Sequence, residues 1–350
     1  MKRKPLQEYW RLMELRLSGS ISLAGRLRLS LIMGLLSAVI CYLRLSGWGF
    51  MAADFTWPWR AAQYLLAGEN PYLLIQPTGG YPAQTYFYYP LTSAILAIPF
   101  AYLHPYIAGA VFFGLSSALL AFAISRDGWN QMPIFLSAPY WIALMVTQWS
   151  PLIVAATLLP WMQWLLVCKP NIGIAGFVYH PTWRGALGSL LFLGLCFLIL
   201  PSWLKDWLRV SATLESHPPP VFILPFGPLL LFGFLRWRTA TGRLFIAMSL
   251  VPQLMFFYDQ LLLWLIPTKW KTGLIYAGLS WTAYILWRLH GLLLTSQSIP
   301  IEPTQYILAL VFLPALVILL WPENWFTKMN RSLKKSTDLI SDIAASQNSD

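Results

Sequence analysis

Apolar windows close to the length of a membrane-spanning helix recur along almost the whole chain. The clearest lie at 29–45, 105–124, 149–168, 219–235, 272–287 and 304–321, and shorter apolar pieces lie at 91–103, 132–147 and 185–200. A helix needs about 20 apolar residues to cross roughly 30 Å of hydrocarbon. Hydrophobic residues make up 57% of the sequence and charged residues 11%, whereas a soluble domain is about 25% charged. The sequence therefore predicts an all-α fold, a polytopic transmembrane helical bundle with about nine to eleven membrane segments.

Basic residues gather beside the apolar windows. Clusters among the 24 Lys and Arg residues lie before residue 29, at 236–243, at 269–271 and after 327. Such flanking clusters mark the cytoplasmic side of a membrane protein. We therefore expect a cytoplasmic basic arm over 1–28, a transmembrane domain over 29–326 and a disordered cytoplasmic tail over 327–350. Because topology accounts for the positive charge, nucleic acid is not an expected partner.

The first apolar window is expected to stay in the cell membrane as an anchor. The arm before this window is too long and too polar for a signal peptide, and no small-residue cleavage site follows the window at 29–45. With the N-terminus inside, residues 46–90 lie on the outer face. Trp59, Ala62 and Leu65 fall on one side of a helical pattern and Arg60 on another. This pattern predicts a helix that lies in the membrane interface.

Two further stretches do not fit single straight spans. A second outer segment is expected at 201–218, because the basic cluster at 236–243 belongs inside. Residues 91–184 must then cross an odd number of times, and at least one of their pieces is expected to be broken or re-entrant. Residues 244–268 lie between two basic clusters that both favour the cytoplasm, so two half-helices that meet near VPQLMFFYDQ are expected there.

Two acidic residues stand apart from those in the tails and polar loops. Asp54 lies at the start of the predicted interfacial helix, and Asp259 lies in the apolar stretch MFFYDQLLLWLIP. An ionised carboxylate in lipid is costly unless it faces a cavity or a partner. Asp54 could cap the helix, a role that Thr56 could fill equally well, or it could act in catalysis or binding. Both acids are therefore candidate functional residues.

Lys169 and Gln148 are polar residues beside apolar runs. Lys169 precedes a proline that opens the next helix, and it could snorkel to an interface or face an anionic lipid phosphate in a broken helix. Gln148 lies between two apolar pieces, where its amide could bond a sugar hydroxyl or tie helices together. For the many Trp and Tyr residues, an interfacial belt and a sugar-binding cleft both remain open.

Several common chemical motifs are absent from the sequence. There is no Walker loop, dinucleotide glycine fingerprint, HExxH or serine elbow, and no paired DxD that would hold a metal against a nucleotide sugar. Cys41, Cys168 and Cys196 lie inside apolar windows without metal-ligand spacing, which favours small core residues. No pattern indicates a cofactor, and whether a divalent metal assists is left open.

The order of the remaining motifs resembles a known family. After the first span come Asp54, LLAGENPY (65–72), YFYYPL (86–91), TQWSPL (147–152), CKPNIG (168–173) and YDQLLLWLIP (258–267). This order is similar to that of GT-C class membrane glycosyltransferases, and most similar to the bacterial polyprenyl-phosphate-mannose-dependent mannosyltransferases. The chain departs from the family at one position, where Thr147 stands in place of the usual Gly and leaves the role of Gln148 in question.

The resemblance implies a site and its substrates. Asp54 would be the catalytic carboxylate, and the substrate-binding residues would be Lys169, Gln148, Tyr89, Asn70, Tyr72 and Asp259. The donor would be a polyprenyl-phosphate sugar, and the acceptor an envelope glycan, lipid or protein on the outer face of the bilayer. A phosphate leaving group needs a cation and the acceptor needs a base, roles open to Lys169 and Asp54. Glu69 is the only other carboxylate in this outer segment, so an inverting reaction is the simpler expectation.

Two other classes of function stay open at this stage. A transporter or flippase of a lipid-linked or anionic substrate would also use broken helices and a buried acid–lysine set, although no internal repeat is present. A non-catalytic scaffold of an envelope complex would use the basic tails for docking.

Overall fold

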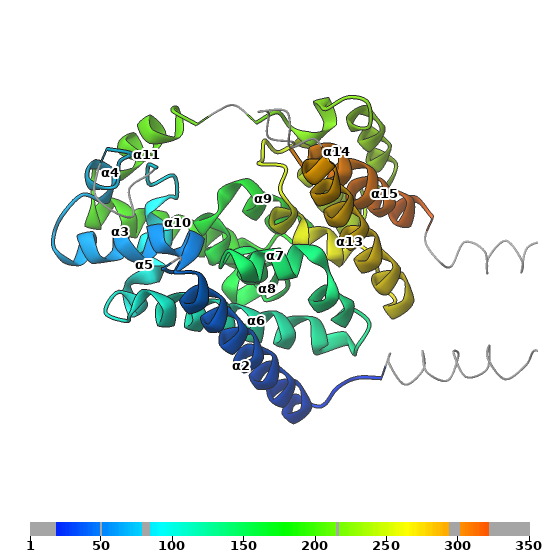
Figure 1. Cartoon of the computed structure of the whole chain (residues 1–350), viewed down its shortest axis with the longest axis horizontal. Helices are drawn as coiled ribbons and strands as arrows, with labels where there is room; N and C mark the ends of the chain where they lie inside the picture. The colour runs from blue at the N-terminus through cyan, green and yellow to red at the C-terminus, as the bar shows by residue number, and fades with distance from the viewer. Residues whose placement is uncertain (1–18, 50, 79–84, 215–216, 294–301, 322–350) are drawn as a thin grey trace, which may run out of the picture.

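The computed structural model describes residues 19–49, 51–78, 85–214, 217–293 and 302–321, and every regular element in these ranges is helical (Figure 1). The α-helices are α2 (Leu23–Trp48), α3 (Thr56–Leu66), α4 (Pro71–Leu74), α5 (Leu91–Ala97), α6 (Pro105–Ile124), α7 (Ala138–Met145), α8 (Ser150–Leu158), α9 (Pro170–Tyr179), α10 (Trp183–Ile199), α11 (Trp203–Ser211), α12 (Ala240–Leu250), α13 (Trp270–Leu293), α14 (Thr304–Ile307) and α15 (Leu313–Leu320). Tighter 3-10 turns form η1 (Ala53–Phe55), η2 (Ile98–Phe100), η3 (Ser125–Asp127), η4 (Met132–Leu136), η5 (Pro160–Cys168), η6 (Pro220–Phe222), η7 (Gly227–Arg236) and η8 (Phe257–Leu265), and a π-helical turn, η9 (Leu308–Phe312), joins α14 to α15. The predicted all-α class is confirmed for these residues. The tail 327–350 and most of the arm 1–28 lie outside them, and α2 already begins at Leu23.

Within the described residues, two helices are long and apolar enough to cross a membrane. They are α2, with 26 residues, and the helical stretch Pro105–Asp127, which extends α6. A third span results if α10 and α11, which are bent by 100° at a short break, are taken together. Shorter apolar helices cover Leu91–Phe100, Gly227–Arg236, Ala240–Leu250 and Thr304–Leu320.

Small residues bring α2 and α6 into close contact along their length (Figure 1). A Cβ built on Gly114 would lie 2.7 Å from Ala38 Cβ and 2.9 Å from the Gly34 carbonyl oxygen, so only glycine fits at this crossing. Such close approach of backbones is how membrane helices associate without a hydrophobic driving force between them. Ser22 caps the start of α2, where its hydroxyl accepts a hydrogen bond from Gly25 N.

The outer surface of the helices is apolar. On α10, for example, Leu190 and Leu191 are each 66% exposed and Leu198 is 83% exposed. Glutamine, serine and threonine side chains are buried inside instead. Soluble monomers rarely expose contiguous apolar surface on this scale. These helices are therefore compatible with insertion into a membrane.

Proline interrupts two of the apolar windows that the sequence presents as candidate spans. Window 149–168 forms α8 and then η5, because Leu159, which precedes Pro160, takes an extended backbone (φ −106°, ψ 99°). Window 219–235 contains η6 and η7, with prolines near the start of each. The expectation of a single helix in these two windows is wrong. By contrast, 244–268 forms the expected pair of short helices, α12 and η8, on either side of extended residues.

Arginines from the basic clusters bind the carboxyl ends of three helices. Arg26 donates to a carbonyl in the last turn of α6 at 2.7 Å, Arg236 to the last carbonyl of α15 at 3.1 Å, and Arg243 to the last two carbonyls of α9 at 2.9 and 3.1 Å. Cations stabilise these ends because the helix dipole is negative there and the last carbonyls lack partners.

The two predicted outer segments, 46–90 and 201–218, pack against each other. A second hydrophobic core lies between them and includes Ala61, Tyr72, Ile75, Phe87, Leu91, Ala94, Cys196, Trp203 and Val210. Figure 1 shows α3, α4 and α11 together at one end of the molecule, far from α13, α14 and α15. The two segments and their helices form an outer layer that packs on the main core. This outer layer forms one side of the cavity described next.

Candidate functional site

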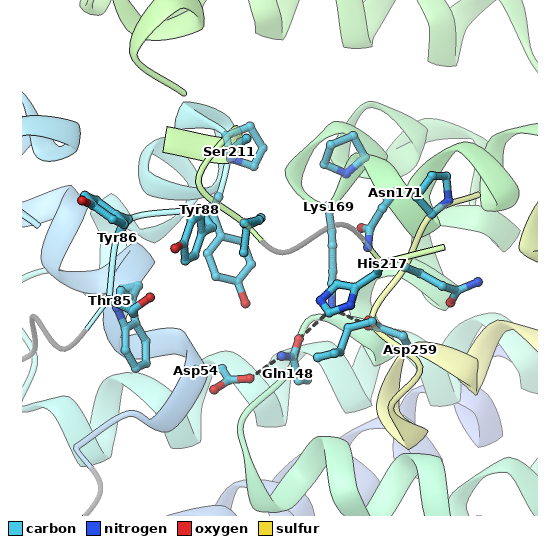
Figure 2. A pocket seen from close by; sticks show the side chains of 18 of the residues that line it. Asp54, Thr85, Tyr86, Tyr88, Gln148, Lys169, Asn171, Ser211, His217 and Asp259 are labelled. Atoms are coloured by element: carbon cyan, nitrogen blue, oxygen red, sulfur yellow. Dashed lines mark hydrogen bonds and ion pairs between the residues drawn. The ribbon is translucent and has the colours of Figure 1, made fainter. Parts of the chain in front are cut away.

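A cavity of about 490 Å³ lies where the outer layer meets the main helical core. One part of its lining is polar and includes Asp54, Gln148, Lys169, Asn171, Gln253 and Asp259. Another part is aromatic and includes Trp57, Tyr86, Tyr88, Tyr89, Trp207 and Tyr258. Figure 2 shows Asp54, Gln148, Lys169 and Asp259 connected by hydrogen bonds and an ion pair, with Tyr86 and Tyr88 on another side of the cavity.

Asp54 is presented to the cavity by the irregular turn that follows α2. Met51 and Ala53 take positive φ values of 45° and 47°, a conformation that is uncommon for residues with a side chain. The Asp54 N–H donates to the carbonyl of Val146 at 3.0 Å. Its carboxylate caps no helix, since the side chain that bonds within this turn is Thr56, whose hydroxyl accepts from Ala52 N at 2.9 Å. The helix-cap interpretation of Asp54 is therefore wrong.

Gln148 stands in the turn between α7 and α8. It follows Thr147, whose φ of 54° is the left-handed conformation that glycine adopts most readily. The Gln148 side chain is almost fully buried, its Nε2 donates to Asp54 Oδ2, and its Oε1 accepts from the backbone N–H of Trp149 at 3.2 Å. Thr147 thus keeps a backbone shape that suits glycine, and the amide of Gln148 still points at Asp54.

Lys169 lies between η5 and α9, where Pro170 begins the next helix. Its ammonium donates to Gln148 Oε1 at 3.0 Å, forms an ion pair with Asp259 and lies 5.0 Å from the ring centre of Tyr258. Only 8% of Lys169 is exposed, so the snorkelling interpretation is wrong. The amino end of α9, with Pro170 and Asn171, also lines the cavity.

Asp259 lies on η8 and is 2% exposed. The ion pair with Lys169 supplies the partner that a carboxylate needs at this depth. The four polar residues therefore form one chain, in the order Asp54, Gln148, Lys169, Asp259. They come from four separate segments of the sequence, so only the tertiary fold brings them together.

The environment of Asp54 shifts its proton affinity. Asp54 lies beyond the end of α2, and part of its surface faces the cavity. Desolvation by the surrounding protein raises the pKa of its carboxyl, while the hydrogen bond from Gln148 and the charge of Lys169 act in the opposite direction. A carboxyl with a raised pKa is a stronger base once ionised, which suits proton abstraction from a hydroxyl.

Apart from Tyr89, the aromatic residues of the cavity were not singled out individually from the sequence. Residues 86–89 form no helix or strand, and the Tyr88 N–H donates to the Tyr86 carbonyl at 3.1 Å; Phe87 is buried in the second core, while Tyr86 and Tyr88 line the cavity. Trp207 of α11 donates from its indole N–H to the carbonyl of Tyr88 at 2.9 Å, which fixes the ring. The only available signal for these residues was the aromatic run YFYYP itself. Nothing in the sequence links Trp207, or His217, which also lines the cavity, to that run.

Two of the predicted substrate-binding residues do not line the cavity. Asn70 caps α4 by accepting from Tyr72 N at 3.0 Å, and its amide donates to Asp206 at 2.8 Å. The Tyr72 hydroxyl donates to the carbonyl of Tyr89 at 3.1 Å. Both residues therefore support the cavity wall, and Tyr89 itself lines it.

Comparisons with protein-family models, with curated proteins and with solved structures find no match to this chain. In the part of the chain that the structure describes, no group of three or more His, Cys, Asp or Glu side chains has the arrangement of metal ligands.

Proposed function

We propose that the protein is a multi-pass membrane glycosyltransferase that moves a sugar from a polyprenyl-phosphate donor to a glycan, lipid or protein acceptor. The observation that carries this proposal is the convergence of Asp54, Gln148, Lys169 and Asp259 on one cavity. The order of sequence motifs that resembles GT-C enzymes supports the same function.

The reaction follows from the groups that face the cavity. The acceptor oxygen attacks the anomeric carbon of the donor sugar, and the bond from that carbon to the phosphate oxygen breaks. The bonding electron pair leaves with the polyprenyl phosphate, and the hydroxyl proton passes to Asp54 as the general base. Asp259 is engaged by Lys169, so Asp54 is the carboxylate that remains for proton transfer among the described residues that line the cavity, which favours inversion of configuration.

Lys169 and the amino end of α9 suit the leaving phosphate. Lys169 immediately precedes this 10-residue helix, whose first N–H groups lack intrahelical partners and whose dipole is positive at this end. A phosphate here would receive the ammonium and the helix end together. Asp259 would then share the ammonium with the phosphate.

The shorter and broken helices belong to the same proposal. We assign the apolar pieces beyond the long spans to a bundle of about nine to eleven membrane segments in the cell membrane. Both termini are assigned to the cytoplasm, because basic clusters mark that side of a membrane protein. Arginines of these clusters bind the carboxyl ends of three helices, which are assigned to the same side. The layer that contains α3 and α11 is assigned to the outer face.

Transfer of labelled sugar tests the proposal directly. The purified protein in liposomes would receive polyprenyl-phosphate hexoses as donors and an envelope extract as acceptor. We expect a new glycosidic product with wild-type protein and a loss of most of it with Asp54→Asn. Movement of the labelled lipid across the bilayer without a new bond would favour a transporter instead, which the buried Lys169–Asp259 pair also suits.

A further inference from the structure

The amide of Gln148 has a single orientation that satisfies its neighbours. Its oxygen accepts from the ammonium of Lys169 at 3.0 Å and from the N–H of Trp149 at 3.2 Å. Both neighbours are donors only, so a flipped amide would place its own N–H groups against them. Lys169 and Trp149 therefore force the amide nitrogen toward Asp54.

The backbone holds both partners of this hydrogen bond. The N–H of Gln148 donates to Ala143 O at 2.8 Å, and the N–H of Asp54 donates to Val146 O at 3.0 Å. The turn that carries Asp54 is thus bonded to the turn that carries Gln148 through main chain and side chain together. The carboxylate oxygen Oδ2 is occupied by the amide, whereas the other oxygen has no bond drawn to it in Figure 2 and points away from Gln148.

We infer that Gln148 is a positioning residue, which holds Asp54 with one carboxylate oxygen free and links it to the charge on Lys169. In the reaction of the proposed function, on which the catalytic meaning of this inference rests, the acceptor proton passes to the Oδ1 atom of Asp54. Gln148 does not touch the reacting atoms. It fixes the carboxylate and favours its ionised form, because an amide polarised by an ammonium is a strong donor.

Other charged and titratable groups among the described residues line the same cavity as Asp54. They are Lys169, Asp259, His217, Tyr86, Tyr88, Tyr89 and Tyr258. Of these, Lys169 and Asp259 are charges that act on the Asp54 carboxyl with opposite sign. Since Gln148→Met leaves all of these groups in place and adds no charge, a change in Asp54 titration in this variant reports on the amide.

The test is a direct titration of Asp54 in the full chain, by infrared difference spectroscopy in nanodiscs. The protonated carboxyl band is assigned by its absence in Asp54→Asn. Gln148→Met keeps the size of the side chain without an amide, and Gln148→Glu replaces the donor with a carboxylate. We expect the pKa of Asp54 to rise by about one pH unit in Gln148→Met and by more in Gln148→Glu.

A second buried glutamine supplies the matched control. Gln163 is fully buried, and its amide is bonded to His180 O and Thr182, outside the cavity lining. Gln163→Met should reduce stability without moving the pKa of Asp54. If Gln148→Met does not fold, Gln148→Leu, which also lacks the amide and adds no charge, takes its place, because the charge of Gln148→Glu would raise the pKa of Asp54 with or without a positioning role.

Each outcome has a distinct meaning. A pKa of Asp54 that is equal in wild type and the Gln148 variants, or that moves as far in Gln163→Met, would overturn the inference. Because the titration needs no sugar transfer, the expected shift in a protein without transferase activity would contradict the proposed function alone. Sugar transfer that persists in the Gln148 variants, together with an unshifted pKa of Asp54, would contradict the positioning role of Gln148 alone.

Discussion

The ammonium of Lys169 forms an ion pair with the carboxylate of Asp259 at the buried end of the cavity. Two oppositely charged groups at this depth compensate each other, and removing one leaves a costly unpaired charge. We expect Asp259→Leu or Lys169→Met alone to destabilise the protein by about 3–5 kcal/mol. The double variant should cost less than the sum of the two, as measured by unfolding in detergent. Additive losses would show that the pair is not coupled.

The same double variant separates stability from donor binding. Lys169→Met with Asp259→Leu should regain folding but not the cation for the donor phosphate. We expect donor binding and transfer to stay reduced, with a loss of about 2.7–4 kcal/mol in transition-state stabilisation. Wild-type turnover in this double variant would remove Lys169 from the mechanism.

Asp54→Asn tests the general base. The substitution keeps the size of the side chain and an oxygen that can accept the hydrogen bond from Gln148. Because the carboxylate caps no helix, we expect the melting temperature to stay the same or to rise slightly. Transfer should fall by about 10²–10⁴-fold, the usual contribution of a general base. The measurement is labelled-sugar transfer normalised to folded protein, and near-normal transfer would count against Asp54 as the base.

The raised pKa of Asp54 predicts two pH dependences of opposite direction. Transfer needs the ionised carboxylate, so activity should fall with decreasing pH at a value above about 3.9, the ordinary pKa of Asp. Stability follows the other direction, because the folded protein binds this proton more tightly than the unfolded chain does. The stabilisation that Asp54 gives to the folded protein is fully present below its pKa in the unfolded chain. It is lost as the pH rises through its pKa in the folded protein. Melting curves of wild type and Asp54→Asn across this range should diverge accordingly, and parallel curves would contradict the shift.

The contact between α2 and α6 predicts a strong effect of side-chain size. Gly114→Ile would force atoms against Ala38 and the backbone of Gly34, so we expect a loss of about 1–3 kcal/mol or more. Gly278 of α13 is the control, since a Cβ there meets nothing within 4 Å. Gly278→Ile should leave the melting temperature nearly unchanged. Equal effects of the two substitutions would mean that the helices do not pack as described.

Cysteine labelling tests the proposed orientation. The three native cysteines are buried, so replacing them with alanine gives a background without accessible thiols. Glu69→Cys and Arg238→Cys then place single thiols on exposed positions at the two proposed faces. We expect an impermeant maleimide to label residue 69 from outside and residue 238 only after the membrane is opened. Labelling of residue 238 in intact cells would reverse the topology.

Local features of this protein were predictable from the sequence because they depend on neighbours along the chain. Apolar windows indicated helices, and the basic clusters on both sides of 244–268 indicated two half-helices. Polar side chains in apolar surroundings identified Asp54, Gln148, Lys169 and Asp259 as candidates, since burial of such groups is costly without a function or a partner.

The tertiary structure decided which of these residues meet and in what order. Gln148 bonds to Asp54 across 94 positions, and Lys169 pairs with Asp259 across 90. Contacts over such separations arise from the packing of helices whose crossing is set by small residues far from the site, such as Gly34 and Gly114. No periodicity or spacing encodes that geometry, so the sequence could nominate the four residues as candidates but not the contacts that join them into one chain.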